Sequence, residues 1–350
     1  MKVFGRRRQM DSEARTASVS PSFAIPGGEV LIELEGLDIG TPSGFHCTIG
    51  GQTAGVTGAS STRILATVPE NSDSGPVEVE IKAGGKEFAG KLVVGKRLAG
   101  DLHQVANPAV DPKDGSVILT RSGTRGQELP VTLFRLDAEG FLTEMSAPVM
   151  NPTGVAFDPH GRLVVTNRAD GEVVQVNNDS EVVPLAGDLG IATGLAFDSK
   201  GELFVGDRGG TVFRVGALGN TETWAVLEPS VSAYHMAFGP NGSLYVSAPG
   251  LCSHDLVYKV DEEGAVDRFF KGLGRPQGLA FDEDGNLFCA ACLKGRHGIV
   301  KISYDGESAE LFLAGMGLVG LCFTRTGEMI AATNDAVFSV DVGIEGILLD

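Results

Sequence analysis

The sequence predicts an all-β protein in which a small β-sandwich precedes a six-bladed β-propeller. Three observations support this prediction. A unit of about 42 residues recurs six times between residues 104 and 342, and each unit holds four short apolar runs separated by turns. The 49 glycines and 7% aromatic residues favour many tight turns over long helices. Four strands in a period of this length are typical of a propeller blade.

The first stretch, residues 1–18, carries cations but no apolar run after them, so it does not have the pattern of a secretion signal. No run of about 18 apolar residues occurs elsewhere, so we expect no transmembrane helix. We therefore expect a disordered tail over residues 1–18 and a cytoplasmic protein.

Residues 19–95 contain alternating strands at short spacing with Pro and Gly at the turns, a pattern typical of a compact β-sandwich. The runs GGEVLIELEGLDIG, IGGQTAGV and ATVPENSDSGPVEVEI resemble the TIG (IPT) immunoglobulin-like domain. This resemblance implies an immunoglobulin-like spacer, dimerisation or recognition module rather than a catalyst, and association through it is possible.

The repeats of the propeller, predicted over residues 96–350, align on one phenylalanine. The copies read PTGVAFDPHG, ATGLAFDSKG, AYHMAFGPNG, RPQGLAFDEDG and LVGLCFTRTG, with anchors at Phe157, Phe197, Phe238, Phe281 and Phe323. A degenerate first copy, NPAVDPKDG, has Val110 at the anchor. The turn after each anchor ends in glycine, which accepts positive φ, and is too short for a calcium loop.

Within one unit, the strand GVAF is followed by RLVVTN, EVVQV and EVVPLA. A single four-stranded sheet would leave apolar faces in water, and a ring of six sheets buries them. We expect either residues 96–103 or the tail 343–350 to add the last outer strand and close the ring.

The ring resembles the NHL-repeat propellers and the gluconolactonase/regucalcin family, on motifs such as GVAFDPHGRLVVTN and GLAFDEDGNLF. Resemblance to the second family implies lactone hydrolysis at a divalent cation. A glutamate, an asparagine and an aspartate would hold the cation at the mouth of the channel, mostly at the residue before the glycine of each opening strand.

Two positions in each blade are predicted to point at this mouth. The position before the glycine is occupied by Ala106, Thr153, Thr193, Tyr234, Gln277 and Val319. The position that ends the second strand is occupied by Arg121, Asn167, Asp207, Ala248, Ala291 and Thr333. The first set has no carboxylate, and hard cations need oxygen ligands with negative charge. We therefore predict no metal and no cofactor, with calcium or zinc as the alternative.

Arg168 and Arg208 are equivalent residues of adjacent blades, in TNRADG and GDRGGT. Two guanidinium groups at one mouth could bind a carboxylate or another anion. In the alternative interpretation each arginine pairs with a neighbouring carboxylate, Asp170 or Asp207, and decorates a loop.

Tyr234 and His235 interrupt the pattern, because the other complete copies have glycine where His235 stands. An imidazole at a channel mouth is a candidate base or ligand, so His235 is the catalytic candidate if the chain is an enzyme. His254 and His297 lie on loops of the next two blades and could join it. An isolated histidine is more often structural.

The 45 acidic and 28 basic residues give a net charge of −17, which argues against nucleic acid or an anionic membrane as the main partner. The odd number of cysteines does not indicate a disulfide framework, and we expect them to be buried apolar residues: Cys47, Cys252, Cys289, Cys292 and Cys322.

We therefore predict a non-catalytic recognition protein whose propeller mouth binds a small anion or a protein segment. The alternative is a lactonase-type hydrolase that uses a divalent metal or His235. A weaker alternative is a structural subunit that docks through the sandwich.

Overall fold

The computed structural model describes residues 15–36, 45–123, 127–251 and 254–347. These residues form strands and turns, and they contain no helix that could cross a membrane. The chain divides into two compact units, residues 1–94 and 95–350, which are described separately.

The first unit is a sandwich of two sheets, as predicted. One sheet has the order β2–β4–β8–β7: Ser18–Ser20, Glu29–Glu33, Arg63–Thr67 and Gly55–Ala59. The other has the order β3–β10–β9–β5–β6, with β1 beside β10: Phe23–Ala24, Lys86–Val94, Gly75–Ala83, Phe45–Ile49, Gln52–Thr53 and Arg15–Thr16. Alternate residues such as Ile32, Ile64 and Ile81 are fully buried between the sheets. The first strand begins at Arg15, inside the stretch assigned to the tail; residues 1–14 lie outside the described part.

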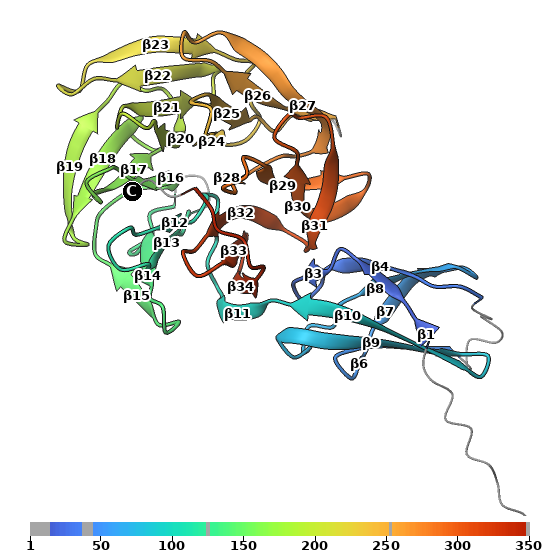
Figure 1. Ribbon diagram of the computed structural model, residues 1–350. Coiled ribbons are helices and arrows are strands. Elements are labelled where there is room, and N and C mark those ends of the chain that lie inside the picture. The colour runs from blue at the N-terminus through green and yellow to red at the C-terminus, as the bar shows by residue number, and fades with distance from the viewer. Residues whose placement is uncertain (1–14, 37–44, 124–126, 252–253, 348–350) are drawn as a thin grey trace, which may run out of the picture. The chain divides into compact units, whose positions relative to one another are not determined.

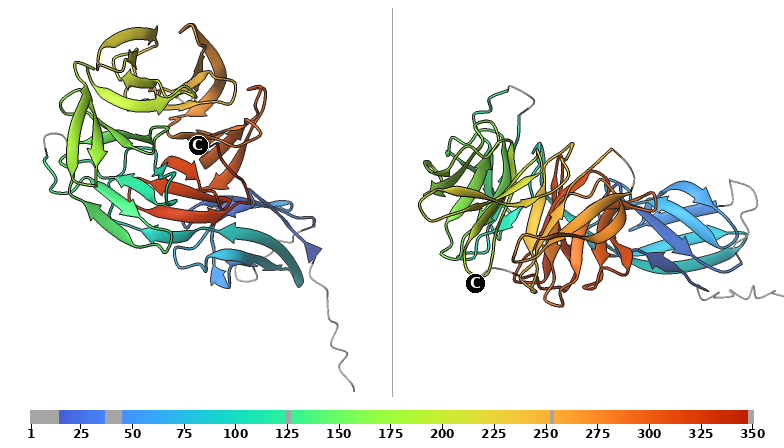
Figure 2. Two further views of the ribbon diagram at one scale, coloured as in Figure 1. Left: turned by 60° about the vertical axis from the view of Figure 1, so that its left-hand side comes forward. Right: turned by 90° about the horizontal axis from the view of Figure 1, so that it is seen from above.

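The second unit is the predicted propeller, with six sheets arranged around one axis (Figure 1; Figure 2). Blade 1 contains β12–β15: Ala109–Val110, Val117–Thr120, Leu133–Leu136 and Leu142–Met145. Blade 2 contains β16–β19: Pro152–Phe157, Leu163–Asn167, Glu172–Asn177 and Glu181–Ala186. Blade 3 contains β20–β23: Ala192–Phe197, Leu203–Asp207, Thr211–Val215 and Thr221–Val226.

The remaining blades follow the same antiparallel pattern. Blade 4 contains β24–β27: His235–Phe238, Leu244–Ser247, Asp255–Val260 and Val266–Gly274. Blade 5 contains β28–β31: Leu279–Phe281, Leu287–Leu293, Arg296–Ile302 and Ala309–Ala314. Blade 6 contains β32–β34: Leu318–Phe323, Glu328–Thr333 and Val337–Asp341.

The ring is closed by β11, Lys96–Ala99, which pairs antiparallel with β34 as the outer strand of blade 6. This confirms the first of the two predicted modes of closure. The C-terminal segment takes another route and reaches blade 5, where Gly346 forms a bridge with Asp282. The Ile347 N–H donates to the Phe281 carbonyl oxygen at 3.1 Å.

Close approach of neighbouring first strands explains the glycine of each repeat. A Cβ on Gly154 would lie 2.4 Å from the Thr193 carbonyl oxygen, and one on Gly194 would lie 2.6 Å from that of Tyr234. Contacts this short are forbidden, so the inner strands can pack at this distance only around glycine.

The turns that follow Phe157, Phe197 and Phe281 begin with aspartate and are Asx turns, whereas Phe238 and Phe323 are followed by Gly239 and Thr324. In the first complete copy the Asp158 carboxylate accepts the backbone N–H groups of His160 and Arg162, at 2.9 and 2.8 Å. Gly161 has φ +67°. The carboxylate is therefore engaged in the turn, and its second oxygen accepts the Nε–H of Arg162.

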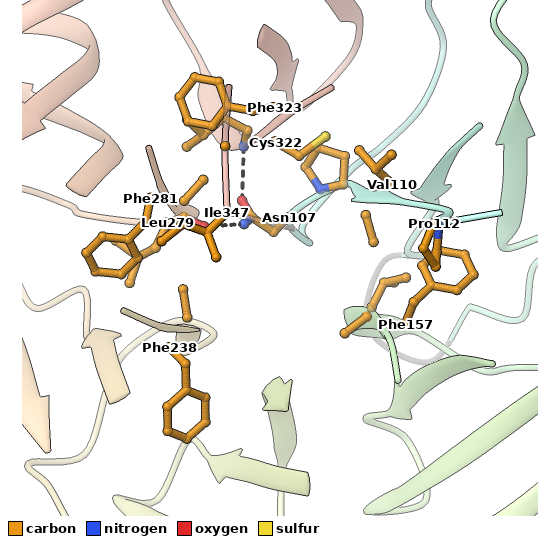
Figure 3. A pocket seen from close by; sticks show the side chains of 18 residues that line it. Asn107, Val110, Pro112, Phe157, Phe238, Leu279, Phe281, Cys322, Phe323 and Ile347 are labelled. Carbon is orange, nitrogen blue, oxygen red and sulfur yellow. Dashed lines mark hydrogen bonds between the residues drawn. The ribbon is translucent and has the colours of Figure 1, made fainter. Parts of the chain in front are cut away.

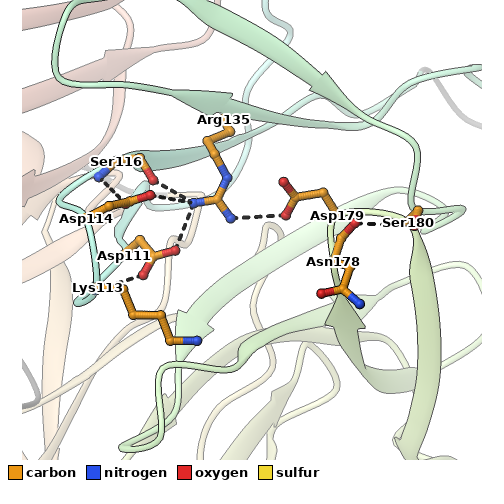
Figure 4. A network of polar contacts seen from close by, with 8 residues as sticks. All are labelled: Asp111, Lys113, Asp114, Ser116, Arg135, Asn178, Asp179 and Ser180. Carbon is orange, nitrogen blue, oxygen red and sulfur yellow. Dashed lines mark hydrogen bonds and ion pairs between the residues drawn. The ribbon is translucent and has the colours of Figure 1, made fainter.

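The degenerate first blade is fastened to blade 2 by Arg135 on β14 (Figure 4). Its guanidinium donates to Asp111 at 2.8 Å and, across the blade junction, to Asp179 at 3.1 Å. It also donates to the Ser116 hydroxyl at 2.6 Å and lies 3.8 Å from Asp114. Three carboxylates around one half-buried cation form a network rather than a cation site.

Candidate functional site

The threonines predicted to face the mouth instead join neighbouring blades. The Thr193 hydroxyl accepts the Tyr234 N–H at 3.1 Å and donates to the Gly206 carbonyl oxygen at 3.1 Å. The Thr153 hydroxyl donates to the Ala192 carbonyl oxygen at 3.2 Å. Both side chains are buried. Crowded inner strands thus use these hydroxyls to satisfy backbone groups of their own and of the next blade, and contact of either threonine with a ligand stays a prediction.

Tyr234 and Gln277 have similar structural roles. Tyr234 is fully buried, and its hydroxyl donates to the Glu228 carbonyl oxygen. Burial, with smaller contributions from nearby acidic groups, raises the pKa of Tyr234 well above its usual value. Gln277 is half-buried; its side-chain amide donates to the Leu318 carbonyl oxygen at 3.5 Å, and its own carbonyl oxygen accepts the Ser247 hydroxyl at 2.6 Å.

The residues that end the second strands differ between blades. The Asp207 carboxylate accepts the backbone N–H of Ile191 at 2.8 Å and so holds the loop that enters blade 3. Asn167 is only 7% exposed, and its side-chain amide donates to the Asp170 carboxylate at 2.7 Å. Its Oδ1 atom is buried and has no hydrogen-bond partner among the described residues. A buried acceptor of this kind is available to a water or a ligand.

Arg168 and Arg208 are both half-buried, and neither forms an ion pair with another described residue. The carboxylates proposed to neutralise them, Asp170 and Asp207, contact Asn167 and a backbone amide instead. Burial, and then the positive charge of Arg208, lowers the pKa of Arg168. The two guanidinium groups are thus close enough to repel each other, which favours an anion beside them.

His235 lies inside the channel wall rather than at the open mouth. The side chain is 4% exposed on β24, and burial lowers its pKa to about 4, so the imidazole is neutral at pH 7. His254 and His297 are exposed and do not line the channel cavity. The predicted histidine cluster is therefore not formed by the described residues.

The channel holds a cavity of two adjoining lobes, of about 200 and 180 Å³, whose walls share Asn107, Phe238 and Ile347. Figure 3 shows the first lobe, where the anchors Phe157, Phe238, Phe281 and Phe323 and the side chain of Ile347 lie around an apolar space. The cavity therefore sits at the level of the repeat anchors.

Asn107, which the sequence did not lead us to predict as a site residue, lies in the wall of this cavity (Figure 3). Its amide nitrogen donates to the Leu279 carbonyl oxygen at 2.7 Å, and its Oδ1 accepts the Leu321 N–H at 2.9 Å. A Cβ on Gly278 would lie 2.0 Å from Asn107 Oδ1, so glycine in blade 5 makes room for it. The signal was present, because Asn107 takes the place of the repeat glycine in the degenerate copy.

The residues at the mouth do not fit the divalent cation that the gluconolactonase/regucalcin resemblance implies. The first ring of positions has no carboxylate, and its threonines are used between blades. Within the described ranges, no three His, Cys, Asp or Glu side chains come together in a group that could hold a metal ion. No metal-dependent step is therefore assigned to this chain.

The described cysteines are free thiols. Cys47, Cys289 and Cys322 are buried, as predicted, and burial raises the pKa of Cys47 to about 11. Cys292 is half-buried, and Cys252 lies outside the described residues. Burial also raises the pKa of Cys289 and Cys322, so these three buried thiols are not reactive thiolates.

Comparison with known proteins agrees with this architecture. Residues 14–93 match the IPT/TIG domain family. A 6-deoxy-6-sulfogluconolactonase of Pseudomonas putida is 29% identical over 243 residues, which cover 60% of this chain and 66% of that protein. The chain thus spans slightly less than two thirds of the length of this curated relative.

Two solved structures share the fold. A gluconolactonase from Xanthomonas campestris has a TM-score of 0.57 and 15% identity, covering 70% of this chain and 88% of that one. An auxiliary nutrient binding protein from Bacteroides ovatus has a TM-score of 0.53 and 15% identity, covering 94% and 98%. The chain therefore joins an IPT/TIG domain at residues 14–93 to a gluconolactonase-like β-propeller.

Proposed function

We propose that the propeller is a lactonase-type hydrolase that acts on a small anionic sugar lactone at its mouth. The observation that carries the proposal is the pair Arg168 and Arg208, half-buried together without a carboxylate partner among the described residues. The name of the curated relative indicates a sugar lactone with a sulfo group, an anion of the kind that two arginines bind.

The chemistry of the pair suits this ligand. A guanidinium presents a planar fork of donors that matches sulfonate, carboxylate or phosphate oxygens, and it stays charged under all ordinary conditions. In this role Arg168 and Arg208 bind the anionic group, and Asn167 Oδ1, the buried acceptor beside them, receives a hydroxyl of the ligand. These interactions bind and orient the substrate.

A second candidate is binding of the same class of ligand without turnover. The donor set favours it, because the described residues form no group that could hold a metal ion, and His235 is a weak base inside the wall. Both candidates require the arginine pair, and they differ in whether the lactone ring is opened.

The test measures binding and turnover on the full chain. Hydrolysis of 6-deoxy-6-sulfogluconolactone and of uncharged gluconolactone is measured by the protons that it releases. Binding of the corresponding open-chain acids is measured by calorimetry. Arg168→Ala combined with Arg208→Ala should weaken binding of the sulfonated ligand by at least about 100-fold, since each charge-assisted hydrogen bond contributes about 1.5–3 kcal/mol.

The matched control is Arg268→Ala with Lys271→Ala, which removes two exposed charges from the outer strand β27. Turnover that prefers the sulfonated lactone would support the hydrolase, and tight binding without proton release would support the second candidate. Equal affinity in the arginine variant and the wild type would refute both. Loss of turnover on chelation would contradict the conclusion about the cation site.

A further inference from the structure

We infer that the channel contains an internal site for a small neutral molecule with an aromatic body and one hydrogen-bonding group. This site is the lobe of about 180 Å³ next to His235. It lies on the walls of the inner strands of blades 2, 3 and 4, and the inference does not depend on the function proposed for the mouth.

His235 is the polar group of this lobe that the fold does not use. The other polar side chains in its wall are satisfied: Thr153 donates to the Ala192 carbonyl oxygen, and Asn107 spans Leu279 and Leu321. The imidazole of His235 forms no hydrogen bond with any described residue. Because it is buried and neutral, it offers one N–H donor and one nitrogen acceptor.

The imidazole of His235 departs from the repeat of the other blades. Blades 2, 3, 5 and 6 have glycine at this position, and those glycines let the inner strands approach. A blade with glycine at position 235 would satisfy the same packing rule. Neither ring nitrogen of His235 is among the fully buried polar atoms without a partner, so the imidazole is open to the lobe, where a ligand or an ordered water can bind it.

The size and chemistry of the lobe define the ligand. Phe197, Met236 and Phe238 give it apolar walls, and no charged residue lines it. An apolar cavity of roughly 150 Å³ stays dry and accepts benzene, whereas a charged ligand would lose its hydration without compensation. A single aromatic ring with one hydroxyl fills such a space and pairs with the imidazole.

Ile347, near the C-terminus, is part of the wall of the lobe. The segment that carries it is held on blade 5 by the Ile347 and Glu283 N–H groups, with bonds of 3.1 and 3.3 Å to carbonyl oxygens. Ile347 is 39% exposed, so this part of the wall is a partly exposed side chain on a short segment. Entry of a ligand from this side needs only local opening.

The test titrates the full chain with 4-fluorophenol and with fluorobenzene, followed by ¹⁹F NMR. We expect 4-fluorophenol to bind at least about 5-fold more tightly, because one hydrogen bond to the imidazole separates the two probes. His235→Gly, which restores the residue of the other blades, should abolish that preference. Ala237→Leu, which fills the wall shared by both lobes, should abolish binding of both probes.

Equal affinity for the two probes in the wild-type protein would overturn the inference, as would no binding of 4-fluorophenol at millimolar concentration. The second result would assign the lobe to ordered water on His235. A preference for 4-fluorophenol that persists in His235→Gly would also contradict it.

Discussion

Asn107→Ala should destabilise the propeller more than the loss of one polar side chain from a surface would. Asn107 donates to the Leu279 carbonyl oxygen at 2.7 Å and accepts from the Leu321 N–H at 2.9 Å. Alanine removes both bonds at once and leaves these backbone groups of blades 5 and 6 without partners in the channel.

The magnitude follows from those two groups. Each net hydrogen bond contributes about 1 kcal/mol, and each buried group left unpaired costs about 1–3 kcal/mol. The site is part-buried, so water partly replaces the lost partners, and we expect a loss of about 2–3 kcal/mol in the free energy of unfolding. For a domain of this size that corresponds to a fall of about 4–12 °C in melting temperature.

The assay is thermal and urea unfolding of the full chain, with Asn220→Ala at an exposed turn of blade 3 as the control. Asn107→Asp sharpens the test, because a carboxylate can still accept from Leu321 but cannot donate to Leu279. The pKa of the introduced carboxyl should be raised in the folded state, so the stability that its proton provides is present at low pH and is lost as pH rises. The deficit of this variant relative to wild type should therefore shrink between pH 7 and pH 4. A melting temperature of Asn107→Ala within about 1 °C of the control would refute the argument.

Three further predictions concern Arg135, Gly194 and His235. Arg135→Met leaves the buried Asp111 without its cation and should cost about 2–4 kcal/mol. Burial raises the pKa of Asp114, but hydrogen bonds from Ser116 and the charge of Arg135 outweigh burial, so the net pKa is lowered. The stability that the ionised Asp114 gains from Arg135 is lost as the carboxyl is protonated in acid. The loss of stability in Arg135→Met, measured by urea unfolding, should therefore be smaller at pH 3 than at pH 7. Gly194→Ala forces a Cβ to within 2.6 Å of the Tyr234 carbonyl oxygen and should cost about 1–3 kcal/mol by thermal unfolding, whereas Gly58→Ala, with 3.8 Å of clearance, should not. Burial lowers the pKa of His235 from 6.5 to about 4, so the unfolded chain takes up its proton first and stability falls as pH drops through this window; His235→Gly should flatten that slope, and an unchanged slope would mean that another group is responsible.

The sequence was sufficient to predict the blades because the repeat encodes them locally. Phe157, Phe197 and Phe281 each precede an Asx turn, every anchor turn ends in a glycine with positive φ, and this short-range chemistry favours a hairpin. The sequence did not decide which of two segments closes the ring. Pairing of β11 with β34 joins residues more than 200 positions apart, and no local pattern encodes that pairing.

The site was harder to predict, because residues at equivalent positions of different blades can make different contacts. Thr153 and Thr193 occupy the positions expected at the mouth, yet the Thr153 hydroxyl donates to the Ala192 carbonyl oxygen of the next blade, and the Thr193 hydroxyl accepts the Tyr234 N–H of the next blade. Arg168 and Arg208 were recognised as equivalent, but the decision between an ion pair and an anion site depended on where Asp170 and Asp207 point. Those directions are set by loop geometry, which the repeat leaves variable.

The packing of the inner strands also explains why an anion site can form at this mouth. The first ring of positions lies so close to the axis that neighbouring blades use its hydroxyls for backbone hydrogen bonds, which leaves little oxygen for a cation. The next positions outward, after the second strands, lie where long side chains have room, and there two adjacent blades have arginine. In this half-buried setting the charge of Arg208 contributes to the lowered pKa of Arg168, and under the proposed function an oxyanion beside the pair would relieve that repulsion. Ligand binding at the mouth should therefore stabilise the propeller, and weaken as salt screens the pair.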